Sequence, residues 1–138
     1  MEQARESLVG LRMSRQRRRD TVPELALRRE LHRRGLRYRV DEPLVGLPRR
    51  RADITFSRAR VVVFVDGCFW HSCPDHRTAP RNNGAWWHAK LERNVERDRE
   101  TDAVLTASGW FVLRFWEHED MIAAADQVER TVRNRITR

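Results

Sequence analysis

Hydrophobic and polar residues alternate with two different periods along the chain, and the changes of period divide it into helices and strands. A helix is predicted to begin at Thr21, which caps it, with Pro23 in the first turn and Glu24 closing a capping box. Leucines recur after this start and supply an apolar stripe. The helix is expected to end near Gly35.

Short apolar runs separated by turn residues follow this helix and predict strands. Alternation at residues 36–40 predicts a first strand, and residues 41–50 are interpreted as a turn-rich loop. Residues 51–56 predict a second strand. The polar turn 57–60 joins it to the apolar run 61–65, so these two strands are expected to form a hairpin.

The second half of the chain returns to helical spacing. A helix is predicted from about residue 85 to residue 108, with Gly109 as its stop, and then a buried strand, 110–116. A last amphipathic helix, 120–136, is expected to bury Ile122, Ala125, Val128, Val132 and Ile136. The order of elements predicts a single α/β domain in which helices flank a central mixed sheet.

Length and charge narrow the class of protein. A chain of 138 residues suggests one core, and no apolar segment reaches the ~18–20 residues that span a bilayer, so no membrane partner is expected. Lys and Arg total 28 against 20 acidic residues, and only Lys90 is a lysine. Arginine suits phosphate and base edges, so nucleic acid is the first partner to consider. The polar N-terminus and two closely spaced cysteines indicate a cytoplasmic protein, and a DNA partner would make it nucleoid-associated.

Residues 1–20 are interpreted as a basic arm that precedes a domain at 21–138. Such a charge run either contacts phosphate or is merely solvated. The arginines of the arm that are candidates for DNA contact are Arg15, Arg17, Arg18 and Arg19.

Both cysteines lie in one short segment after the apolar run 61–65. Cys68, Cys73 and His76 offer three ligands to a tetrahedral Zn²⁺ ion. His118, which follows the strand 110–116, is the candidate for the fourth ligand, and His71 competes with it. The alternative is two unpaired thiols that happen to lie close.

Two aspartates interrupt apolar strands, where an unpaired carboxylate is costly. Asp53 lies inside the second strand and Asp66 ends its hairpin partner. With Glu24 they offer the oxygen ligands that Mg²⁺-dependent phosphodiester cleavage needs. The alternatives are a capping role for Glu24 and a solvated, bent strand at Asp53.

Two further residues are candidates for proton transfer. His71 could take a proton from an attacking water near neutral pH, and Asp98 could orient a histidine across a cleft. The simpler interpretation of Asp98 is a surface carboxylate that lies among arginines.

Paired aromatic residues are a further unusual feature. One tryptophan of each pair is expected to face outward, where it could stack on bases or wedge between them. The alternative is packing beneath the loop. The residues are Phe69, Trp70, Trp86 and Trp87.

Five segments together resemble the Vsr family, the very short patch repair endonucleases: "RRDTVPE", "ADITF", "VVVFVDGCFWH", "WWHAKLERNVERDRE" and "GWFVLRFWE". The resemblance runs from about Arg12 to about Glu119. It implies a restriction-endonuclease-like fold of the PD-(D/E)XK type. It also implies an enzyme that nicks duplex DNA 5′ to the thymine of a T:G mismatch left by deamination of 5-methylcytosine, with catalytic Mg²⁺ and structural Zn²⁺.

The resemblance also implies roles for single residues. Asp53 would be the main Mg²⁺ ligand, beside the backbone carbonyl of Val65. His71 would be the general base, oriented by Asp98, with Glu24 as an accessory acid. The paired aromatic residues would wedge into the duplex.

The zinc site departs from the family pattern. Cys68 and Cys73 match the family's zinc ligands, and His76 and His118 are expected to replace ligands that this chain lacks. Asp66 stands where some relatives have a histidine, which would favour a second cation.

The expected partner is double-stranded DNA with a T:G mismatch, bound by a monomer, and other mismatch-repair proteins remain open as partners. Two alternatives stay in view. One is a nuclease of the same fold with another lesion or sequence specificity. The other is a zinc-stabilised DNA-binding module without catalysis, which would need neither Asp53 nor His71.

Overall fold

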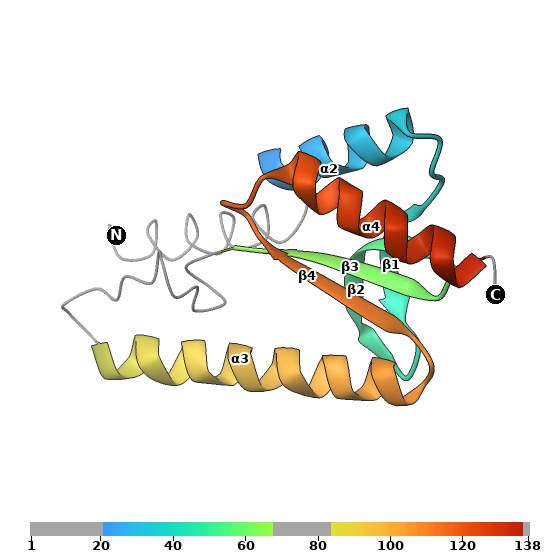
Figure 1. The fold of residues 1–138 in the computed structure, drawn as a ribbon. Coiled ribbons are helices and arrows are strands. Elements are labelled where there is room, and N and C mark those ends of the chain that lie inside the picture. The colour runs from blue at the N-terminus through green and yellow to red at the C-terminus, as the bar shows by residue number, and fades with distance from the viewer. Residues whose placement is uncertain (1–20, 68–83, 137–138) are drawn as a thin grey trace.

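A mixed sheet of four strands with helices on both faces makes up residues 21–67 and 84–136, which the computed structural model describes (Figure 1). The elements are α2 (Val22–Arg33), β1 (Arg39–Leu44), β2 (Leu47–Phe56), β3 (Val61–Asp66), α3 (Gly84–Ala107), β4 (Phe111–Trp116) and α4 (Met121–Ile136). None of the helices among these residues is long and apolar enough to cross a membrane.

The strands follow one another in the order β1-β2-β3-β4. The first three pair antiparallel, whereas β3 and β4 pair parallel, from Val61 beside Phe111 to Asp66 beside Trp116. A parallel pair needs a crossover connection, and α3 lies within it. The C-terminal ends of β3 and β4 therefore lie side by side.

Each face of the sheet has its own core. Helices α2 and α4 pack together on one face and α3 lies on the other (Figure 1). Side chains of β3 alternate between the two clusters, with Val63 and Val65 on the α2–α4 side and Val62 and Phe64 on the α3 side. Alternation is the normal result of a pleated strand that is covered on both faces. This arrangement confirms the predicted helix-flanked sheet.

Several predicted boundaries are confirmed. The Thr21 side chain accepts the Glu24 N–H at 3.3 Å and so caps α2, and Gly35 follows the helix with φ of 86°. Residues 57–60 do turn the β2–β3 hairpin. Helix α3 ends at Ala107, before Gly109 with φ of 85°.

The prediction for residues 36–50 was wrong. The first strand begins at Arg39 instead of residue 36, and the expected loop is instead a hairpin in which Leu44 pairs with Leu47 around Gly46, whose φ is 82°. Proline argued for a loop, but β1 is an edge strand, where a missing N–H leaves no partner unsatisfied. Pro43 therefore fits within it.

The predicted buried face of the last helix was wrong at both ends. Ile122 is 52% exposed and Ile136 is 39% exposed, whereas Met121 and Ala124 are buried. The buried stripe is thus rotated by about one residue at the start of the helix, where Met121 rather than Ile122 meets the sheet. Ala124 and Ala125 are both buried in the core on this face of the sheet.

Candidate functional site

Strand β2 changes face at Asp53. Ala52 packs in the α3-side core and Ile54 in the opposite core, although residues two apart in a regular strand share a face. Asp41, on the facing stretch of β1, has a φ of 53°, a left-handed conformation that is uncommon for a residue other than glycine. Asp53 lies at this local irregularity.

The Asp53 carboxylate bonds to β3 beyond the last backbone pair of the β2–β3 ladder. The register of β2 on β3 runs from Phe56–Val61 to Ile54–Val63. Beyond it, Oδ2 of Asp53 accepts the backbone N–H of Val65 at 2.8 Å. This bond ties Asp53 to the end of β3 and holds its carboxylate next to the Val65 peptide.

Helix α2 adds a second acid to this point. Glu24 lies in the first turn of α2 and is only 2% exposed. Burial raises the pKa of Asp53 well above its ordinary value, and the neighbouring charges of Glu24 and Asp66 raise it further against the lowering effect of the Val65 N–H. Arg28 partly balances Glu24, with its Nη1 at 3.6 Å from Oε2 of that residue. The site therefore concentrates negative charge in a place shielded from water.

Asp66 ends β3 on the α3 face, where an arginine of β4 binds it. Nη1 of Arg114 donates to both Asp66 carboxylate oxygens, at 3.2 and 3.1 Å. The same guanidinium lies 4.1 Å from the centre of the Phe64 ring. Stacking and ion pairing together fix the plane of the guanidinium.

Helix α3 contributes two more carboxylates to the same arginine. Nε of Arg114 donates to Asp102 at 2.9 Å, and Nη1 lies 3.8 Å from Oδ1 of Asp98. Burial alone would lower the pKa of Arg114, but hydrogen bonding to Asp102 and the charges of Asp66 and Asp98 outweigh it and raise that pKa. Asp66 thus already has a cationic partner, which weakens the reason for expecting a second metal ion there.

The described residues contain no group of three or more His, Cys, Asp and Glu side chains that is arranged to hold a metal ion. Most of the predicted zinc ligands lie outside the described residues, namely Cys68, Cys73 and His76. The competing His71 lies outside them as well. His118 is described and is exposed just beyond β4. The zinc ligands therefore stay a prediction.

Of the predicted wedge residues, Trp86 can be placed. Its side chain is 52% exposed near the start of α3, with Nζ of Lys90 at 5.2 Å from the ring centre. It confirms that one tryptophan of this pair faces outward. The Trp87 side chain lies outside the described part of the structure. So do the other candidates for DNA contact, which are Phe69, Trp70, Arg15, Arg17, Arg18 and Arg19.

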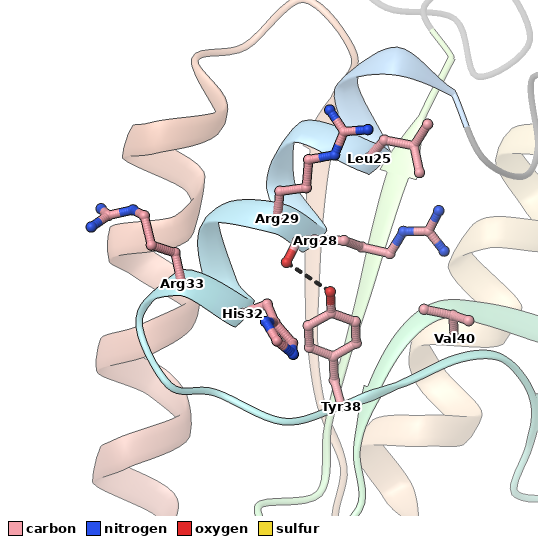
Figure 2. A pocket seen from close by; sticks show the side chains of 7 residues that line it. All are labelled: Leu25, Arg28, Arg29, His32, Arg33, Tyr38 and Val40. Carbon is pink, nitrogen blue, oxygen red and sulfur yellow. Dashed lines mark hydrogen bonds between the residues drawn. The ribbon is translucent and has the colours of Figure 1, made fainter.

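Two features escaped the sequence predictions. Arg114 was passed over, although a single arginine inside the apolar run "FVLRFW" is a signal for a buried ion pair. The second is an open pocket of about 430 Å³ between α2 and β1, which Figure 2 shows. Its lining consists of Leu25, Arg28, Arg29, His32, Arg33, Tyr38 and Val40.

Comparison with known proteins identifies a family to which the chain is similar. Residues 4–76 match the family model of the DNA mismatch endonuclease Vsr. The type II nicking enzyme V.NaeI of Lentzea aerocolonigenes is 48% identical over 123 residues, which cover 87% of this chain and 74% of that protein. The type II nicking enzyme V.NmeDIP of Neisseria meningitidis serogroup C is 38% identical over 83% of this chain and 79% of its own length.

The DNA mismatch endonuclease Vsr of Escherichia coli strain K12 is also similar to the chain. It is 39% identical over 101 residues, which cover 72% of this chain and 62% of that protein. The region that the family model matches includes Asp53. The chain therefore belongs to the Vsr family of DNA endonucleases.

Proposed function

We propose that this protein nicks one strand of duplex DNA 5′ to the thymine of a T:G mismatch, with Mg²⁺ bound at Asp53. The observation that carries the proposal is the half-buried Asp53 carboxylate next to Glu24, which is 2% exposed, at the end of β3. A module that only binds DNA has no need to bring two acids together out of water, where their mutual repulsion costs stability.

The donor set fits Mg²⁺, which prefers oxygen ligands and often keeps several waters beside one or two carboxylates. Asp53 and the carbonyl of Val65 would hold the ion, with Glu24 next to them. Burial and the nearby charge of Glu24 raise the pKa of Asp53, and a bound divalent cation would stabilise its charged form. When bound, Mg²⁺ would stabilise the charge that builds on the scissile phosphate.

The residues of the chain would supply the rest of the chemistry. His71 would accept the proton of the attacking water, and Asp98 would orient its imidazole. Asp98 lies on α3 within 3.8 Å of Arg114, so the arginine would hold that carboxylate beside Asp66. The structural zinc ion would fix the segment that carries His71, with Cys68, Cys73, His76 and His118 as ligands.

Mismatch recognition would come from aromatic side chains that enter the base stack. Trp86 is exposed at the start of α3 and is available for such a contact. Phe69 and Trp70 would act with it from the preceding segment. The relatives named type II nicking enzymes favour one alternative, a nuclease of the same fold with another lesion or sequence specificity.

The test is single-turnover cleavage beside equilibrium binding on the same labelled duplexes, with both strands mapped. The duplexes carry T:G, U:G or a fully paired site, each with and without Mg²⁺. We expect one cut, 5′ to the mismatched thymine, only when Mg²⁺ is present. Asp53→Ala and His71→Ala should each lower the rate by ~10²–10⁴-fold or more and leave binding largely intact.

Three outcomes would contradict the proposal. Cuts in both strands of paired DNA would indicate a restriction-type nuclease. Binding without cleavage under any divalent cation would favour the non-catalytic module. Wild-type cleavage by Asp53→Ala would remove this acid cluster from the reaction.

A further inference from the structure

The pocket between α2 and β1 adjoins the acid cluster, which consists of Asp53 and Glu24. The two are connected both through the helix and through the sheet. On the helix, Arg28 lines the pocket and also contacts Glu24, one helical turn away. On the sheet, Val40 lines the pocket and pairs with Ile54, the residue after Asp53. A group seated in the pocket is therefore a near neighbour of whatever occupies the acid cluster.

The floor of the pocket is apolar and fixed in place. Tyr38 donates its hydroxyl to the backbone carbonyl of Arg28 at 2.7 Å, as Figure 2 shows. Its ring also meets Phe56 edge to face, with 5.9 Å between centres. Leu25 and Val40 extend this apolar surface. An apolar floor of this kind suits a sugar ring or another carbon-rich group rather than a bare ion.

The rim of the pocket is basic. Arg28 and His32 flank Tyr38, whereas Arg33 points away from it in Figure 2. Arg33 is bound to Glu30, with its Nε at 3.1 Å from Oε1. Among residues 21–67 and 84–136, no carboxylate lies within ion-pair distance of Arg29. Arg29 is therefore the rim charge that is most available to an anionic ligand.

We propose that this pocket binds a sugar-phosphate unit of the DNA strand beside the scissile phosphate, with Arg29 and His32 contacting the phosphate and Tyr38 and Val40 facing the sugar. The assignment rests on the proposed nuclease function, because the acid cluster marks the position of the scissile phosphate. It adds a DNA contact on α2 to those expected of the basic arm and the aromatic residues.

The spacing of charges along DNA favours this ligand over an acidic peptide. Each strand carries one phosphate per about 3.4 Å of helix axis. If the strand runs along α2 from a scissile phosphate at Asp53, its next phosphate would lie within one or two turns of that helix. A pocket of about 430 Å³ is larger than one phosphate requires and leaves room for the attached sugar.

The experiment measures equilibrium binding to a T:G duplex without added divalent cation, at several salt concentrations. It compares the wild-type protein with Arg29→Ala, His32→Ala and a control, Arg58→Ala. Arg58 is exposed in the β2–β3 turn, at the end of the hairpin away from Asp53. A set of duplexes, each with one neutral methylphosphonate in place of a phosphate around the nick position, completes the design.

Arg29→Ala should weaken binding roughly five- to tenfold and lower the salt slope by about 1, whereas Arg58→Ala should change neither. One methylphosphonate position should weaken wild-type binding and leave Arg29→Ala unaffected, because the partner charge is already gone. The binding of His32→Ala should likewise be unaffected by a methylphosphonate at that position.

Equal binding by Arg29→Ala and Arg58→Ala would overturn the inference and leave a carboxylate-bearing peptide as the better ligand for the pocket. A loss of affinity that no single methylphosphonate position removes would also overturn it. The two proposals can fail separately. Binding with the expected coupling but without cleavage would contradict only the nuclease function, and wild-type cleavage without coupling would contradict only the pocket assignment.

Discussion

The backbone N–H of Val65 donates to Oδ2 of Asp53 at 2.8 Å, across the point where β2 changes face. This bond stabilises the charged form of Asp53, but burial and the nearby Glu24 oppose it more strongly, so the pKa of Asp53 is raised. A residue that the fold holds in a strained electrostatic position is typical of a functional site rather than of a structural one.

The raised pKa predicts how stability depends on pH. Because the folded state holds this proton more tightly than the unfolded state, stability is greatest below the ordinary carboxylate range and falls as pH rises through the raised pKa. Without divalent cation, the wild-type protein should lose unfolding free energy over this window, and Asp53→Asn should lose less. Chemical denaturation at a series of pH values measures the difference.

A surface carboxylate serves as the control for this experiment. Glu96 is exposed on α3, so Glu96→Gln should follow the wild-type pH dependence. Added Mg²⁺ should raise the stability of the wild-type protein at neutral pH more than that of Asp53→Asn. Parallel curves for the wild-type protein and Asp53→Asn would show that Asp53 carries no net strain.

Arg114 is predicted to be the residue whose loss most damages the α3 side of the sheet. Arg114→Met should cost roughly 3 kcal/mol of unfolding free energy, because Asp66 would remain buried without its partner. Asp102→Asn should cost less than about 1 kcal/mol, since that side chain is 39% exposed. Denaturant titration at neutral pH measures both.

Arg99 provides the matched control, because it is an exposed arginine of α3 that follows Asp98 in the chain. Arg99→Met should leave stability unchanged within about 0.5 kcal/mol. Arg114→Lys should recover only part of the loss, since lysine cannot keep both the stacking on Phe64 and the two-sided ion pairing. Full recovery by lysine would show that charge alone matters here.

The sequence predicted those parts of the fold that local chemistry decides. The Thr21 cap, the 57–60 turn and the stop at Gly109 each depend on residues close together in the chain. The β1–β2 hairpin was missed because its prolines and Gly46 indicate a loop unless one knows that β1 lies at the sheet edge. Edge position depends on the whole sheet and cannot be inferred from that segment.

The same contrast holds for the site. Asp53, Asp66 and Glu24 could be selected from sequence because acids in apolar elements are costly. The role of Arg114 could not, since it depends on the parallel register that sets Phe64 beside Arg114 and on the position of α3 above both. Long-range register is the information that local patterns lack.

Zinc content is the direct test of the ligand set that lies mostly outside the described residues. Protein purified without chelator should contain about one zinc ion per chain, and Cys73→Ser should lose it. His118→Ala should lower zinc affinity, because His118 follows the strand that pairs with β3. Elemental analysis measures the metal. Full zinc in His118→Ala together with loss in His71→Ala would move the fourth ligand to His71.

The last prediction concerns Trp86 and discrimination of the mismatch. Trp86→Ala should reduce the preference for T:G over paired DNA, since a wedge stabilises only a duplex whose bases separate easily. The loss should be roughly tenfold if the ring stacks on one base. Stability should hardly change, because the ring is 52% exposed and its removal leaves no cavity. Competition binding with the two duplexes measures the preference.

Phe111 is the fitting control for Trp86, because it is also an exposed aromatic residue near a cation, with Arg135 at 5.8 Å from its ring. Trp86 lies in the first turn of α3, and Phe111 begins β4 just after this 24-residue helix ends, so at about 1.5 Å per residue the two lie near opposite ends of the helix. Phe111→Ala should therefore leave discrimination unchanged. If both variants lose the same preference, the effect is a general loss of apolar surface, and Trp86 does not enter the duplex.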